Sequence, residues 1–202
     1  MKNNVNSKKF WNDCYANNQI GWDLGKITPV FKDWCDRLTD KKSIFVPGSG
    51  NGYDPLYFAK KGHNVTAVDF SSIAVENMTK KAISENINMN ILKEDIFNLK
   101  SYHFNQYDYV IEYTCFCAID PNKRLDYIKI MNDVLMKNGE LVGLFLPLLK
   151  DKSEGGPPFS VDLEEVLEQF SKYFKVIKSI KHPLSVKPRY ENEQYIHFKK
   201  IC

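Results

Sequence analysis

The chain has 202 residues, of which 43% are hydrophobic and 26% charged, and its formal net charge is +3 at pH 7. This composition is typical of a globular protein and excludes wholesale disorder, and the length predicts a single domain over residues 1–202. The charge excess is too small for a protein that binds nucleic acid by neutralising phosphates. The longest apolar stretch, residues 141–149, falls well short of the roughly 20 residues of a membrane-spanning helix, so no membrane span is expected.

The amino-terminal residues are polar and basic with no apolar run behind them, so we expect no signal peptide. The five cysteines are odd in number and scattered along the chain. This distribution favours a reducing compartment over a disulfide framework. We therefore expect a cytoplasmic protein without nucleic-acid or membrane partners.

Residues 1–42 precede the first predicted strand and contain all three tryptophans of the chain. They predict an extension of one or two helices that packs over an edge or the top of a sheet. Thr28-Pro29 is a typical helix start, because proline suits the first turn. The apolar residues that follow it recur on one helical face.

From residue 43 onward, short apolar runs alternate with helical patterns. They predict strands over residues 43–47, 64–69, 89–93, 107–113, 140–147, 174–181 and 194–199. The first five are apolar on both faces, which is typical of an α/β sheet covered by helices on both sides. Asp54-Pro55, Asp120-Pro121 and Ser160 predict the starts of the helices, which end near residues 61, 136 and 170.

The first strand runs directly into a glycine-rich turn, Gly48-Ser49-Gly50-Asn51-Gly52. Glycines there allow a tight turn and a close approach of the backbone to a ligand. Asp69 follows Gly50 by 19 residues, at the end of the next predicted strand. In a doubly wound sheet its carboxylate lies beside the glycine loop, where it can accept both hydroxyls of a ribose.

The spacing of the glycines discriminates between cofactors. A dinucleotide fingerprint has its third glycine three residues after the second, but Tyr53 occupies that position and Gly52 comes one residue early. This favours S-adenosylmethionine, a nucleoside cofactor without phosphates, over NAD. Asp95 and Ile96 end the third strand, where an acid can accept from an adenine amino group and an apolar side chain can pack on the ring. An NAD-linked oxidoreductase and a non-catalytic, cofactor-sensing module remain as alternatives.

Several motifs together resemble the thiopurine methyltransferase family, closest to its thiol and halide methyltransferase branch. They are residues 11–15 with 21–25, the glycine loop at 46–52, residues 112–119 with Arg124, and residues 155–159. The resemblance covers residues 10–198. It implies a Rossmann-like class I methyltransferase fold, with strand order 3-2-1-4-5-7-6, an antiparallel last strand and an amino-terminal helical lid.

The resemblance also implies roles for individual residues. In the family, aromatic residues matching Trp11, Tyr15 and Trp22 lie over the cofactor, and the glycine loop, Gly48 and Gly50, contacts it. Residues matching Asp69 hold the ribose, and those matching Asp95 and Ile96 hold the adenine. Glu112 and Tyr113 match positions that face the methionine portion and the substrate, and Arg124 matches a position near the active site. Tyr113 and Arg124 are the catalytic candidates, since either could orient the nucleophile.

The implied activity is methyl transfer from S-adenosylmethionine to a small soft nucleophile, with S-adenosylhomocysteine as the product. A thiol or sulfide is the expected acceptor, and a halide ion or another small-molecule acceptor is the alternative. In-line displacement on an activated methyl group needs no metal. No metal site is expected, because Cys115 and Cys117 lack a second Cys or His pair at ligand spacing.

Overall fold

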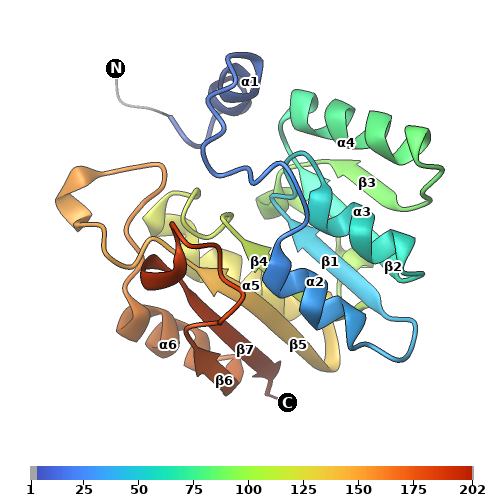
Figure 1. Ribbon diagram of the computed structural model, residues 1–202. Coiled ribbons are helices and arrows are strands. Elements are labelled where there is room, and N and C mark those ends of the chain that lie inside the picture. Colours follow the sequence, from blue (N-terminus) through green and yellow to red (C-terminus); the bar gives the residue numbers. More distant parts are fainter. Residues whose placement is uncertain (1–3, 202) are drawn as a thin grey trace.

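The computed structural model describes residues 4–201 and contains a seven-stranded sheet in the order β3-β2-β1-β4-β5-β7-β6 (Figure 1). β7 pairs antiparallel with β5 and β6, and the other neighbouring pairs are parallel. The predicted fold class and strand order are therefore confirmed. The strands are β1 Ser43–Pro47, β2 Asn64–Asp69, β3 Asn90–Lys93, β4 Tyr107–Tyr113, β5 Leu135–Phe145, β6 Phe174–Ile180 and β7 Gln194–Lys200.

Helices cover both faces of the sheet (Figure 1), and the alternation of side chains in β1 explains why that strand is apolar throughout. Phe45 packs into a core with α5 and α6, whereas Ile44 and Val46 pack against α2 and α3 on the opposite face. The sheet therefore has one apolar core on each face. The helices are α1 Lys8–Ala16, α2 Pro29–Asp36, α3 Tyr53–Lys60, α4 Ser72–Ser84, α5 Arg124–Val134 and α6 Leu163–Ser171.

The amino-terminal segment forms α1 and α2, as predicted. α2 turns its apolar face, with Trp34, into the core. α1 lies beside α4 at the edge where the central strands end (Figure 1). The tryptophans of this segment therefore divide between two places, with Trp34 in the core and Trp11 and Trp22 over the strand ends.

Two predicted helix starts are wrong, in one case because the predicted cap bonds elsewhere and in the other because another residue caps the helix. Asp54 does not cap α3, because this helix begins at Tyr53, directly after Gly52. The Asp54 carboxylate instead accepts the N–H and the hydroxyl of Thr28, at 2.8 and 3.0 Å. Ser160 does not cap α6, because the Asp162 carboxylate accepts the first free N–H groups of that helix.

β5 differs most from its prediction. It runs over Leu135–Phe145, so α5 ends at Val134 and the strand begins well before the predicted residue 140. Leu135 pairs with Tyr107 of β4 before an irregularity in the register, and it is fully buried. The local sequence around residue 135 is typical of the end of a helix, but pairing with β4, which is distant in the sequence, makes these residues a strand instead.

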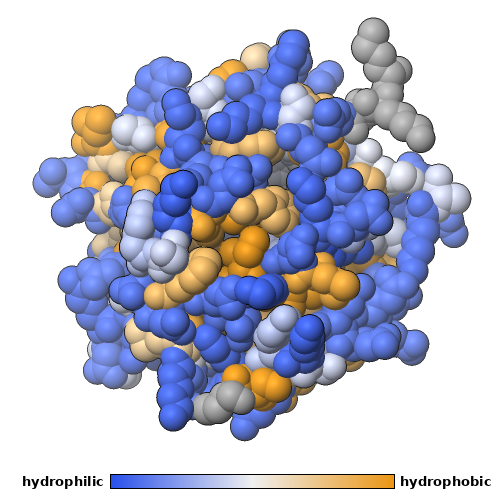
Figure 2. Space-filling model, turned by 180° about the vertical axis from the view of Figure 1, so that it is seen from behind, coloured by the Kyte–Doolittle hydropathy of each residue, from blue (hydrophilic) through white to orange (hydrophobic). Residues whose placement is uncertain are grey.

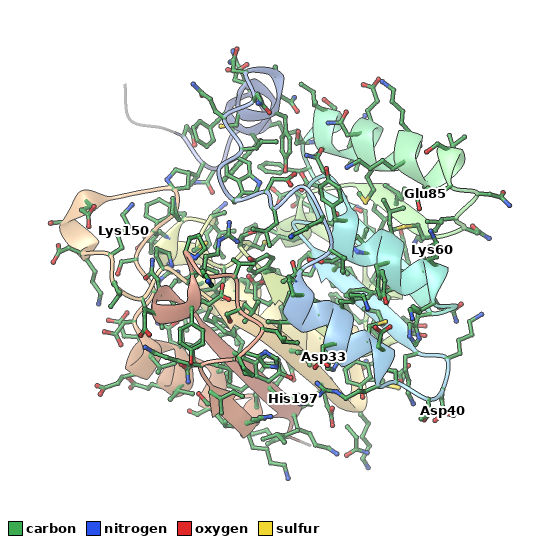
Figure 3. The ribbon with its side chains drawn as sticks, in the orientation of Figure 1. Asp33, Asp40, Lys60, Glu85, Lys150 and His197 are labelled. Carbon is green, nitrogen blue, oxygen red and sulfur yellow. The ribbon has the colours of Figure 1, made fainter. Side chains whose placement is uncertain are left out.

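The face seen from behind is mostly hydrophilic (Figure 2). In the view from behind, polar residues cover most of the face and apolar side chains show through in separate places (Figure 2). Exposed ion pairs join neighbouring elements, such as Lys60 of α3 with Glu85 at the end of α4, at 3.3 Å (Figure 3). Within residues 4–201, no helix combines the length and apolarity that crossing a membrane requires.

Candidate active site

A cavity of about 500 Å³ opens where the central parallel strands end. This volume is in the range of sites that bind small molecules and cofactors. Its walls come from the amino-terminal segment, the ends of β1 to β5, the loop after β5 and the segment before β7. Of the residues predicted from the sequence, the cavity is lined by Trp11, Tyr15, Trp22, Gly48, Asp69, Asp95 and Ile96.

The glycine loop passes close to two other parts of the site. Gly48 has φ +57°, and a Cβ there would lie 2.8 Å from Sγ and 2.9 Å from Cβ of Cys115. Gly50 has φ +54°, and a Cβ there would lie 2.9 Å from the Tyr15 hydroxyl. Any other residue would therefore push the loop away from the turn after β4 or from the amino-terminal segment.

Asp69 ends β2 and reaches the glycine loop, as predicted from its spacing. Its Oδ2 accepts the N–H of Gly50 at 2.9 Å, and its Oδ1 accepts the N–H of Ser71 at 2.8 Å. Each oxygen retains a lone pair for a hydroxyl in the cavity. Burial raises the pKa of Asp69 to about 6, because desolvation outweighs the bonds from the backbone N–H groups.

Asp95 and Ile96 line the cavity just beyond the end of β3. Asp95 caps a short 3₁₀ turn, Ile96–Asn98, by accepting the N–H of Phe97 at 3.0 Å. This bond uses Oδ1 and fixes the direction of the carboxylate. Ile96 is 8% exposed and presents an apolar surface to the cavity beside it.

The aromatic residues of the amino-terminal segment form one cluster over the cavity. The ring of Trp22 lies edge-on to those of Trp11 and Tyr15, with centroid distances of 5.6 and 5.8 Å. The indole N–H of Trp11 donates to the carbonyl of Val5 at 2.8 Å. All three rings are half-buried, and together they roof the cavity.

The amino-terminal segment is fastened to the rest of the site by polar side chains. The Ser71 hydroxyl, two residues after Asp69, donates to Asn12 at 2.8 Å. In the glycine loop, the Asn51 amide donates to Asp23 at 2.6 Å. Each contact lies next to a residue that reaches the cavity, so the position of the roof depends on the same loops that form the walls.

Four predicted residues lie outside the lining of the large cavity. Glu112 is 1% exposed and points into the turn that follows β4. Tyr113 lines an adjoining cavity of about 60 Å³, as does Gly50. Arg124 is buried, donates to the carbonyl of Ser160 at 3.0 Å, and stacks 4.6 Å from the ring centre of Phe116.

Arg189 is a residue of the cavity that the sequence analysis missed. Its guanidinium donates to the Tyr113 hydroxyl, and to the carbonyls of Trp22 at 2.8 Å and Gly21 at 3.4 Å. It stands in an irregular segment between β6 and β7, and no local pattern marks such a residue. The fold alone joins it to partners 76 and 167 residues away.

Two further parts of the cavity wall come from residues that were not among the predicted site residues. Pro157 and Pro158, in the long loop after β5, line the cavity, as does Asn192. The Asn192 side chain accepts the N–H of Leu149 at 2.7 Å, which fastens that loop to the segment before β7. The loop length and its prolines were visible in the sequence, whereas its contact with residue 192 was not.

Comparison with known proteins identifies the family. The model of the thiopurine S-methyltransferase family matches residues 6–197. A protein of Arabidopsis thaliana named "Probable thiol methyltransferase 2" is 33% identical, over 96% of this chain and 86% of that protein. Thiocyanate methyltransferase 1 of the same plant is 30% identical, over 95% of this chain and 84% of that protein.

A solved structure agrees in fold. The 1,6-didemethyltoxoflavin-N1-methyltransferase of Burkholderia thailandensis, determined with S-adenosylhomocysteine bound, has a TM-score of 0.77 at 15% identity, covering 96% of this chain and 87% of that one. Its likeness concerns the fold, and the family match covers nearly the whole chain. The chain therefore belongs to the thiopurine S-methyltransferase family and is an S-adenosylmethionine-dependent methyltransferase.

Proposed function

We propose that the protein methylates a small soft nucleophile, a thiol or sulfide species or a halide ion, by in-line displacement. The placement of Arg189 carries this proposal. A cation fixed by hydrogen bonds lies in the wall of a cavity whose other walls are largely apolar, with aromatic and proline side chains among them. Such a wall attracts a polarizable anion and offers few hydrogen bonds to a strongly hydrated one. The relatives named for thiol and thiocyanate methylation support the same acceptor class.

The residues of the cavity fit S-adenosylmethionine. Asp69 keeps one free lone pair on each carboxylate oxygen, which suits the two ribose hydroxyls. Asp95 and Ile96 pair an acceptor with an apolar surface, which suits adenine. Gly48 lines the cavity, where a residue without a side chain lets the backbone come close to the amino-acid part. The roof of Trp11, Tyr15 and Trp22 suits the positive sulfonium, because aromatic faces attract cations.

When bound, S-adenosylmethionine supplies a methyl group that its sulfonium already activates, so what remains for the chain is to align the acceptor and exclude water. Arg189 would hold the acceptor with the N–H groups that its bonds to Tyr113 and the roof leave free. A thiol of pKa about 8.5 already supplies some thiolate at neutral pH, and the cation increases that fraction. A halide has no proton to lose, so neither acceptor class requires a strong base.

We assign Tyr113 and Arg124 positioning roles rather than contact with the acceptor. The Tyr113 hydroxyl accepts from Arg189 and so fixes the guanidinium at the end of β4. Burial raises the pKa of Tyr113, which keeps this hydroxyl neutral at working pH. Arg124 ties α5 to Ser160, at the end of the loop that carries the proline wall.

Arg189→Met keeps an unbranched side chain but removes the guanidinium with its charge and its N–H groups. We expect kcat/KM for anionic acceptors to fall about 10- to 150-fold, the value of a hydrogen bond to a charged group. The affinity for S-adenosylhomocysteine should fall much less. Lys187→Met, on an exposed side chain two residues away, is the matched control and should change neither value. Equal kinetics for the Arg189 variant and the wild type would remove the main support for an anionic acceptor.

The experiment that tests the function is methyl transfer from labelled S-adenosylmethionine to a panel of acceptors. The panel contains hydrosulfide, methanethiol, aromatic thiols, thiopurines, thiocyanate, iodide and bromide, with detection of volatile products in the headspace. Turnover of small thiols or halides supports the proposal, and the ratio of kcat/KM values ranks them. Silence across the panel with retained cofactor binding would overturn the acceptor class.

The pH dependence of cofactor affinity tests the ribose contact separately. Ribose hydroxyls donate to an ionised carboxylate, and the pKa of Asp69 without ligand is about 6. Affinity for S-adenosylhomocysteine should therefore be constant well above pH 6 and fall up to tenfold per pH unit below it. Asp69→Asn should remove this pH dependence of the affinity.

The stability of the free protein should change with pH in the opposite direction. Because folding raises the pKa of this carboxyl, its contribution to the free energy of unfolding falls as pH rises from about 4 to 6.

A further inference from the structure

Glu112 is an almost fully buried carboxylate close to the site, and its hydrogen bonds all lie behind the cavity wall. Its Oε1 accepts the N–H of Phe116 at 2.8 Å and the N–H of Cys115 at 3.1 Å. Its Oε2 accepts the hydroxyl of Tyr127, which is fully buried on α5. The carboxylate thus binds a turn on one side and a helix on the other.

The turn that Glu112 holds forms part of the cavity wall. Thr114 begins it with φ +59°, a left-handed conformation that is uncommon for a residue with a branched side chain. Thr114, Cys115 and Cys117 line the cavity. Without an acceptor beneath it, the turn would leave two buried N–H groups unpaired and would relax.

The same turn sets the position of the glycine loop. The Cys115 side chain lies so close to Gly48 that no methyl group fits between them. A shift of the turn toward the loop is therefore blocked, and a shift away opens a gap under Gly48. Tyr127 thus contacts Glu112, Glu112 contacts Cys115, and Cys115 contacts Gly48.

We propose that Glu112 is a positioning residue for methyl transfer, which fixes the turn after β4 and, through Cys115, the glycine loop that holds the cofactor. This role differs from direct contact with the methionine portion, because Glu112 does not line the cavity. The inference rests on the proposed function only in taking this cavity as the site of methyl transfer, and it holds for any acceptor.

The charge of Glu112 is secondary to its shape in this role. Burial raises its pKa to about 7, against the opposing effect of the bonds from the turn and from Tyr127 and of the nearby Arg124. Other groups beside it are the thiols of Cys115 and Cys117, whose pKa values are also raised by burial. At pH 8 the carboxylate is ionised and accepts all three donors, so the variants are best compared there.

Two variants separate shape from charge. Glu112→Gln keeps the length of the side chain and an oxygen that accepts the N–H groups of Cys115 and Phe116. The amide N–H₂ of the glutamine can in turn donate to the Tyr127 oxygen. Glu112→Asp keeps the charge but withdraws the carboxylate by one methylene. We expect Glu112→Asp to lower kcat about 10- to 100-fold, the effect of misplacing reacting groups by about 1 Å. Glu112→Gln should restore at least a third of the wild-type kcat.

The readouts distinguish positioning from a structural role. Affinity for S-adenosylhomocysteine, measured by calorimetry, needs no acceptor and therefore does not depend on the proposed substrate class. Hydrogen exchange at the amides of Cys115 and Phe116 should accelerate at least tenfold in Glu112→Asp below its unfolding temperature, and stay protected in Glu112→Gln. Glu168→Asp, on the exposed face of α6, is the matched control.

A reversed order, with Glu112→Asp active and Glu112→Gln inactive, would show that the charge acts directly and would overturn the proposal. Unchanged kcat and amide protection in a folded Glu112→Asp would overturn it as well. Should that variant fail to fold, Tyr127→Phe decides instead, since it removes one of the three bonds and leaves the carboxylate free to turn. It should then lower kcat about threefold to tenfold, and wild-type kcat in this variant would refute the proposal.

Discussion

Asp69→Ala should weaken the binding of S-adenosylmethionine and S-adenosylhomocysteine by about 2–4 kcal/mol, or roughly 30- to 700-fold. The carboxylate is 9% exposed, and each of its oxygens is directed by one backbone N–H. Alanine removes the acceptor for both ribose hydroxyls. It also leaves the N–H groups of Gly50 and Ser71 without their partner, so the glycine loop loses a fixed point as well.

Isothermal calorimetry with S-adenosylhomocysteine measures this effect without an acceptor. Asp33→Ala is the control, because Asp33 lies on α2 (Figure 3), does not line the cavity, and forms an exposed ion pair with Arg37 at 2.8 Å. It should leave the affinity unchanged. Asp69→Asn, which keeps the size of the side chain, should fall between the two. Wild-type affinity in Asp69→Ala would show that the ribose lies elsewhere.

Gly48→Ala should both destabilise the protein and abolish tight cofactor binding. A left-handed residue with a Cβ costs about 1–2 kcal/mol, and overpacking of a core site adds about 1–3 kcal/mol. The added methyl would lie 2.8 Å from Sγ and 2.9 Å from Cβ of Cys115, which is too close for a rotamer change alone to relieve. We expect a loss of about 2–5 kcal/mol in the free energy of unfolding.

Gly62→Ala separates the strain from the clash. Gly62 has φ +94° and open space where a Cβ would stand, so this variant suffers the backbone strain alone. Urea unfolding of both variants gives the stability difference, and titration with S-adenosylhomocysteine gives the affinity. A Gly48→Ala variant that is no less stable than Gly62→Ala and binds the ligand normally would mean that the glycine loop and the turn after β4 are not tightly packed.

Local sequence patterns predicted the features that depend on neighbouring residues. The apolar runs that became β1, β2 and β4 were predicted with the boundaries that the structure shows, because buried parallel strands must be apolar on both faces. The same holds for the glycine loop and Asp69, since one βαβ unit brings their two strand ends to one edge of the sheet. The family's strand order came from the motifs, and the sheet confirms it.

Predictions that depended on a choice of partner were less successful. Asp54 has the sequence pattern of a helix cap, but Thr28 offers it two donors. The sequence predicts that Leu135 belongs to a helix, but Leu135 is buried in the sheet and begins β5. Glu112 was expected to face the cavity from the end of β4, and it turns instead toward the buried hydroxyl of Tyr127. In each case several local arrangements have similar energies, and a distant contact selects one.

Sequence patterns were enough to predict the class of this protein, its glycine loop and the acid beside that loop, because these follow from spacing within single βαβ units. The side chains that close the site could be found only from the fold. Arg189 reaches Tyr113 across 76 residues and the carbonyl of Trp22 across 167, and no local pattern encodes such contacts. They exist because the order of strands in the sheet brings β4, the segment before β7 and the amino-terminal segment to one edge.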